Sequence, residues 1–167
     1  MNKMAGWIGL WLVVSLVLSA CGGAPASQDA SVVRIGWAGS PDTLNPGAAL
    51  LSESFVFFEL VYSSLVDLQL DGTYTPDLAE SWTTSEDGTI WTFKIREGVK
   101  FSDGAPLTAR DVVFTYQFYQ QHEEFPFMNG YTSAFDTVTA PDDQTVVLNL
   151  NSPAPSLESQ IVFLYIL

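Results

Sequence analysis

The sequence predicts an α/β protein whose strands form a mixed sheet. Three observations support this class: residues 90–96 and 145–151 alternate apolar with polar side chains, and residues 112–118 form a largely apolar segment behind a capping motif. Alternation with a period of two is typical of a half-buried strand, whereas a capped apolar run is typical of a helix. We therefore expect strands and helices to share one core.

The first 21 residues predict export and a lipid anchor. Lys3 precedes an apolar run from Trp7 to Leu18, which is short for the roughly 20 residues of a membrane-spanning helix but typical of a secretory leader. The string LSAC that ends at Cys21 resembles the lipobox of bacterial lipoproteins, which implies a cysteine lipidated through its sulfur. We expect a lipoprotein signal peptide at residues 1–20, lipid attachment at Cys21 and a flexible tether at 21–31.

Two alternatives to a lipoprotein signal peptide stay open for this segment. One is an ordinary leader whose cysteine is incidental, and the other is an uncleaved anchor helix. Cys21 is the only cysteine, so no disulfide forms within the chain.

The mature domain is predicted to begin with a strand and a helix. Residues 32–37 (VVRIGW) predict a buried strand, which Gly39 and Pro41 break. Glu53 to about Ser64 predict a helix that is apolar on nearly every face, which indicates that protein encloses it. A strand over residues 65–70 and a turn at Asp71 and Gly72 follow.

Residues 80–96 predict a β-hairpin. Glu80–Thr84 and Ile90–Arg96 form its strands, and Gly88 supplies the positive φ that a tight reversal needs. Val99 and Phe101 predict a short third strand between two further glycine turns.

A capped helix and a second hairpin come next. Thr108, followed three residues later by Asp111, is a variant of the capping box and predicts a helix through Phe118. Residues 135–140 and 145–151 bracket a polar turn, which predicts the second hairpin. The chain then stops on an apolar run, Ile161–Leu167, from which we expect a truncated domain.

The literal strings of this region resemble a known family. LAESW, EDGTIWTFKIREGVKFSDG and PLTARDVVFTY, in that order, resemble the extracellular solute-binding proteins of family 5, the oligopeptide, dipeptide and nickel class. The resemblance implies a periplasmic-binding-protein-like type II fold, of which residues 32–167 supply part of the first lobe only. It also implies a substrate-binding lipoprotein of an ATP-binding cassette importer, which captures peptides or similar small solutes and delivers them to a permease.

The same resemblance suggests where a solute binds. In this family the first strand and a segment of the form P-x-x-L-x-P lie along the cleft, and residues 41–46 fit that form. A loop after the capped helix can also approach the ligand. The candidate ligand-binding residues are Trp37, Gly39, Ser40 and Tyr131. The alternative is that Trp37 lies in the core and the aromatic loop at 125–131 packs on its own domain.

Charge and motif content argue against nucleic acid, metal and catalysis. Six Lys and Arg stand against 19 Asp and Glu, a net charge of −13, so a phosphate backbone would repel the chain. One His and one Cys cannot form the usual nucleophile and base pair, and the common catalytic motifs are absent. His122 beside Glu123 and Glu124 suggests a metal, but a solvated helix end is the better interpretation. We predict no enzyme, no cofactor and no bound metal.

Two other function classes stay open at this point. The chain is alternatively a surface lipoprotein that acts as a structural or adhesive carbohydrate-binding module. It is also compatible with an exported hydrolase, because a pair of catalytic carboxylates meets in space rather than in sequence. In the preferred interpretation the protein is exported, lipid-anchored to the cell membrane and faces the periplasm or the cell exterior.

Overall fold

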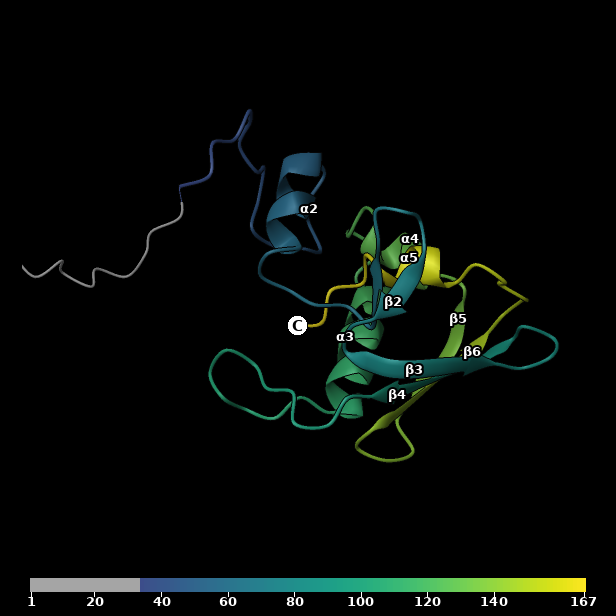
Figure 1. Cartoon of the computed structure of the whole chain (residues 1–167). Helices are drawn as coiled ribbons and strands as arrows, with labels where there is room; N and C mark the ends of the chain where they lie inside the picture. The colour runs from purple at the N-terminus through teal and green to yellow at the C-terminus, as the bar shows by residue number, and fades with distance from the viewer. Residues whose placement is uncertain (1–33) are drawn as a thin grey trace, which may run out of the picture. The chain divides into compact units, whose positions relative to one another are not determined.

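A four-stranded antiparallel sheet forms the centre of the domain. The computed structural model describes residues 34–167; residues 38–167 form one unit, and residues 34–37 belong to another and are described separately. The strand order is β3-β4-β6-β5 (Figure 1). Phe93 pairs with Val146, and Trp91 pairs with Leu148. The strands are β3 (Ala79–Thr84), β4 (Ile90–Ile95), β5 (Phe135–Thr139) and β6 (Thr145–Leu150).

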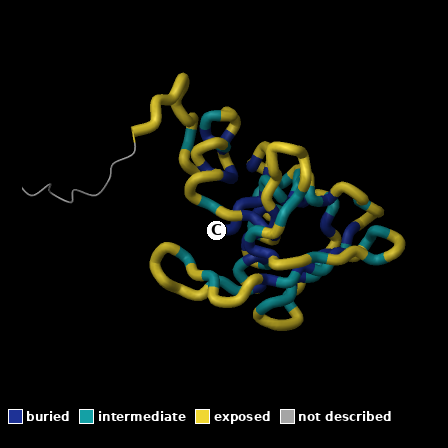
Figure 2. Tube along the Cα trace, viewed as in Figure 1, coloured by how far each residue is buried: buried dark blue, intermediate teal, exposed yellow. Residues whose placement is uncertain are grey.

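The helix α3 (Ala109–Gln121) packs on this sheet and contacts β5 and β6. The alternation predicted for both hairpins is confirmed, because the apolar residues of each central strand are buried. The buried residues of the two central strands and of α3 include Trp91, Phe93, Ile95, Val146, Leu148, Val112, Tyr116 and Tyr119. Figure 2 shows this buried centre surrounded by exposed loops.

The predicted capping box and hairpin turn are both present. The Asp111 carboxylate accepts hydrogen bonds from the backbone N–H of Thr108 at 2.7 Å and from its hydroxyl at 2.8 Å. Gly88 has a φ of 70° in the turn between β3 and β4. An L side chain rarely adopts that φ, so the turn requires glycine.

Shorter elements cover one end of the sheet. The hairpin β1 (Val66–Leu68) and β2 (Tyr74–Pro76) precedes β3, and the remaining helices are α2 (Ser52–Phe58), α4 (Met128–Thr132) and α5 (Glu158–Ile161). The segment after α5 enters the core, where Leu164, Tyr165 and Ile166 are buried. The Ile166 N–H donates to the Ser63 carbonyl at 2.9 Å, so this segment is held beside the chain that leads into β1.

Three sequence predictions about strands are wrong. Residues 34–37 form no strand, because none of the described strands pairs with them. Val99 and Phe101 form a looped excursion rather than a third strand; the region contains one isolated bridge, between Lys100 and Pro106. The expected sheet is mixed, with parallel and antiparallel pairs, but every strand pair within residues 34–167 is antiparallel. The α/β class itself is confirmed.

The predicted helix 53–64 is shorter and more exposed than expected. It ends at Phe58, and the following residues close it with turns in which Leu60 and Val61 donate to the carbonyls three positions back. Phe58 is buried, but the side of the segment that bears Leu60, which is 65% exposed, has no covering element within the described residues. None of the helices within residues 34–167 has the length and hydropathy that spanning a membrane requires.

Candidate functional site

Asp42 fixes the P-x-x-L-x-P segment to the start of α2. Its carboxylate accepts hydrogen bonds from the Ser54 hydroxyl at 2.5 Å, from the Leu50 N–H at 2.9 Å and from the Leu51 N–H at 3.5 Å. The Ser54 hydrogen bond is the main reason that the pKa of Asp42 is lowered. The N-cap residue Leu51 provides no side-chain cap, and a carboxylate from outside the helix holds the backbone just before its first turn.

The structure brings Gly39 to the first turn of α2. A β-carbon on Gly39 would lie 2.7 Å from the Glu53 Oε1 atom, so the absence of a side chain lets the backbone pass close to the helix. Ser40, the next candidate, is exposed. Trp37 lies in the unit of residues 34–37 and is 41% exposed there.

Tyr131 lines a small aromatic pocket. The pocket has a volume of about 190 Å³ and is formed by residues from three separate parts of the chain. Tyr131 stacks on Phe163 with ring centres 5.7 Å apart and planes at 19°. Across the pocket, Phe55 meets Phe127 edge to face at 5.7 Å. The lining of this aromatic pocket is Ser52, Phe55, Phe127, Tyr131 and Phe163.

The chemistry of the aromatic pocket suits an apolar group. Its lining includes no acidic or basic residue, and its polar side-chain groups are the hydroxyls of Ser52 and Tyr131. Aromatic walls with few polar groups are typical of small-molecule sites. The pocket is too small to enclose a whole peptide, but it has room for one side chain. The position of Tyr131 in the loop after α3 predicts it as a ligand-binding residue. Nothing in the local sequence distinguishes Phe163, because it belongs to the apolar run 161–167.

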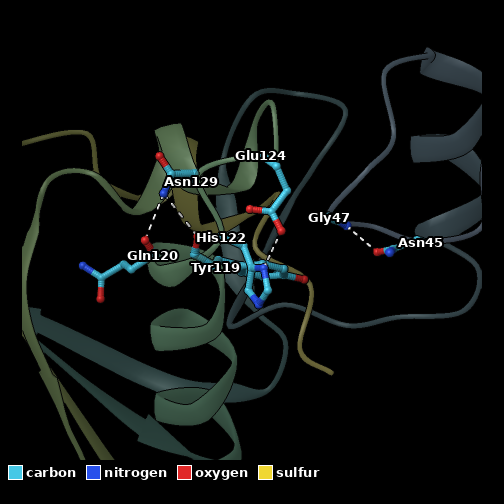
Figure 3. A network of polar contacts seen from close by, with 7 residues as sticks. All are labelled: Asn45, Gly47, Tyr119, Gln120, His122, Glu124 and Asn129. Carbon is cyan, nitrogen blue, oxygen red and sulfur yellow. Dashed lines mark hydrogen bonds and ion pairs between the residues drawn. The ribbon is translucent and has the colours of Figure 1, made fainter.

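The His122 and Glu124 pair lies at the end of α3 (Figure 3). His122 Nδ1 lies 2.6 Å from Glu124 Oε1, and this contact lowers the pKa of Glu124. Asn129 Nδ2 donates to the Gln120 carbonyl at 3.0 Å, so side chains also satisfy the last carbonyls of the helix. Within residues 34–167 no three His, Cys, Asp or Glu side chains are grouped to hold a metal ion.

Figure 3 also shows the polar turn within the P-x-x-L-x-P segment. Asn45 Oδ1 accepts a hydrogen bond from the Gly47 N–H at 3.0 Å. Gly47 itself lies against the ring of Phe125, which is buried. The segment is thus attached by Asp42 to α2, and Gly47, which directly follows it, packs on the loop after α3.

Comparison with solved structures defines the class of protein. The crystal structure of Haemophilus influenzae OppA in complex with RPPGFSPFR matches with a TM-score of 0.70 and 26% identity, over 77% of this chain and 29% of that chain. The likeness confirms the predicted periplasmic-binding-protein-like fold, over part of a longer chain.

The sequence comparison then gives the family. Residues 73–167 match the model of the bacterial extracellular solute-binding proteins, family 5 Middle, and the chain belongs to this family. It is 31% identical over 179 residues to the oligopeptide-binding protein OppA of Bacillus subtilis (strain 168), covering 93% of this chain and 33% of that protein. Over 77 residues it is 43% identical to the nickel-binding periplasmic protein of Escherichia coli (strain K12), covering 46% of this chain and 14% of that protein.

These relatives are binding proteins, which agrees with the prediction that the chain is not an enzyme. The chain spans at most about a third of the length of the two curated relatives.

Proposed function

We propose that this chain is the amino-terminal part of the substrate-binding lipoprotein of an ATP-binding cassette importer. It captures peptides or similar small solutes outside the cytoplasmic membrane and delivers them to a permease. The family match over residues 73–167 carries this proposal. The likeness to a relative solved in complex with RPPGFSPFR favours a peptide as the solute.

The aromatic pocket supplies a place for one apolar group of such a solute. Tyr131 lines it, and the backbone at Gly39, which Ser40 follows, approaches the same helix, α2, that carries Phe55. Trp37 completes the set of proposed ligand contacts. Backbone groups of an extended segment suit peptides, because main-chain hydrogen bonds give affinity with little side-chain preference.

A second lobe that closes over the solute strengthens its capture. Contacts made by both lobes shift the equilibrium between open and closed forms toward the form that the permease recognises. The present chain supplies part of one lobe in this proposal, and the remainder belongs to the longer protein typical of the family.

The anchor completes the proposal. The signal peptide at residues 1–20, the lipid on Cys21 and the tether at 21–31 lie outside the described residues, and the LSAC string supports them. A lipid anchor would hold the domain at the membrane, facing the periplasm or the cell exterior, beside the permease. Three curated relatives are named as periplasmic proteins.

Native mass spectrometry of the full chain, expressed in a bacterium and purified without unfolding, tests solute capture. We expect a bound peptide mass that disappears when the protein is unfolded. In parallel, an alkyne fatty acid fed to the cells should label the wild-type chain and leave Cys21→Ser unlabelled. Protein that carries no solute, together with equal labelling of both chains, would contradict the proposal.

A further inference from the structure

A second, larger cleft lies beside the aromatic pocket and shares Phe163 with it. Its volume is about 430 Å³, within the range of about 300–1,000 Å³ that is usual for ligand pockets. Three carboxylates line it from three places in the chain: Glu59 just after α2, Asp67 in β1 and Asp77 between β2 and β3. We call this hollow the acidic cleft.

A buried hydroxyl without a partner forms part of the same wall. Tyr165 lines the acidic cleft, is 3% exposed, and its hydroxyl makes no hydrogen bond. The ring is held in place, because it packs edge to face on Phe58 at 5.7 Å and its backbone carbonyl accepts a hydrogen bond from Tyr119. Burying a hydroxyl without a partner is unfavourable. The hydroxyl is therefore available to a group that enters the cleft.

The carboxylates act on each other and on that hydroxyl. Burial and the negative charge of Asp67 both raise the pKa of Asp77, although the Ser64 N–H donates to its carboxylate at 3.2 Å. Burial raises the pKa of Tyr165, and the charge of Glu59 raises it further. The charge of Arg96 lowers the pKa of Asp77, but Arg96 does not line the cleft. A positively charged ligand would relieve the repulsion between these groups.

We propose that the acidic cleft binds an organic ammonium group, with Glu59, Asp67 and Asp77 as its counter-charges and the Tyr165 hydroxyl as a neutral acceptor. An ammonium has three N–H donors and no acceptor, which matches a wall of carboxylates and a free hydroxyl oxygen. A bare metal ion fits less well, because within residues 34–167 no three such ligands are grouped around one point.

The ammonium group has two possible sources in a peptide, its amino terminus or a lysine side chain. The inference rests on the proposed solute-binding function and deepens it, because it names the charge of the group that this lobe recognises. Phe163 lies between the acidic cleft and the aromatic pocket. A peptide whose ammonium lies next to an apolar side chain would fill both hollows.

Isothermal titration calorimetry of the full chain with three probes tests the inference. Trialanine carries a free amino terminus, N-acetyl-Ala-Lys-Ala carries only the lysine ammonium, and N-acetyl-trialanine carries neither. We expect at least one of the first two to bind about tenfold or more tightly than N-acetyl-trialanine, as hydrogen bonds between charged groups suggest. The tighter probe identifies the source of the ammonium.

Variants then connect the binding to the cleft. Glu59→Gln and Tyr165→Phe should each weaken the preferred probe by about threefold or more and leave N-acetyl-trialanine unchanged. Glu86→Gln, which removes the same charge from the distant turn between β3 and β4, is the matched control and should bind as the wild type does. Thermal melting by circular dichroism verifies that each variant is folded.

The outcomes separate the two proposals. Equal binding of all three probes, or full affinity in both cleft variants, overturns the ammonium site and leaves peptide capture standing. Binding of none of the three by the wild-type chain overturns the ammonium site and also counts against peptide capture by this chain.

Discussion

The Ser54 hydroxyl donates a hydrogen bond to the Asp42 carboxylate, twelve positions earlier in the chain, at 2.5 Å. Ser54 is fully buried in the first turn of α2. The contact connects the P-x-x-L-x-P segment to the helix that supplies Ser52 and Phe55 to the aromatic pocket. Together with the hydrogen bonds from Leu50 and Leu51, this contact holds a proposed solute-binding segment against the pocket wall.

This contact predicts a pH-dependent contribution to stability. The pKa of Asp42 is lowered in the folded chain, mainly by Ser54. Such a carboxylate adds stability above its unfolded pKa of about 3.9, and that stability is lost as the pH falls through the lower folded value. Ser54→Ala should therefore lower the urea midpoint at pH 7, and the difference from wild type should shrink below pH 3.9. Ser52→Ala, which removes an exposed hydroxyl of the same helix, is the control. The prediction is contradicted if Ser54→Ala lowers the urea midpoint by the same amount at pH 7 and below pH 3.9.

Loss of the hydroxyl should change the unfolding free energy differently at two tyrosines of α3. The Tyr119 hydroxyl donates to the Tyr165 carbonyl at 2.8 Å, whereas the Tyr116 hydroxyl is buried without a partner. Tyr119→Phe should cost about 1–2 kcal/mol of unfolding free energy, because a buried carbonyl loses its donor. Tyr116→Phe should be neutral or stabilising. Urea unfolding of both variants measures the difference, and equal destabilisation would show that the Tyr165 carbonyl contact contributes nothing.

Two glycines offer a similar comparison. A β-carbon on Gly47 would lie 2.5 Å from the ring of Phe125, while one on Gly130 would meet nothing within 4 Å. Gly47→Ala should destabilise the chain by about 1–3 kcal/mol, because the buried ring has to move. Gly130→Ala lies within α4 and should be neutral or stabilise by up to about 1 kcal/mol. Thermal melting monitored by circular dichroism distinguishes the two, and a neutral Gly47→Ala would mean that the ring moves without cost.

Local sequence signals predicted the elements that form from neighbouring residues. The hairpin turn at Gly88 and the capping box of Thr108 and Asp111 depend on residues a few positions apart, so their patterns were sufficient. The strand expected at 32–37 has the right composition, but a strand also needs a partner, which an apolar run does not reveal. The exposed side of residues 56–61 was missed for the same reason, because enclosure depends on distant elements.

The candidate site was predictable only in part. Tyr131 was identified because it follows α3, but Phe55 and Phe163 reach the same pocket from segments more than a hundred positions apart. The carboxylates of the acidic cleft, Glu59, Asp67 and Asp77, likewise follow no regular spacing in the sequence that would predict their proximity. Such sites depend on how the chain folds back on itself, and the buried segment after α5 is what completes both hollows.

The aromatic pocket predicts a measurable preference for an aromatic side chain in the solute. Tyr131→Ala removes the ring that stacks on Phe163, and an aromatic pair contributes about 0.5–1.5 kcal/mol, or roughly two- to tenfold in affinity. The full chain should therefore bind Ala-Phe-Ala more tightly than trialanine by calorimetry, and Tyr131→Ala should lose most of that preference. Phe114→Ala removes another stacked ring, 60% exposed on α3 and outside the pocket, and should retain the preference. If both variants keep it, the aromatic pocket does not contact the solute, and Tyr131 packs only on its own domain.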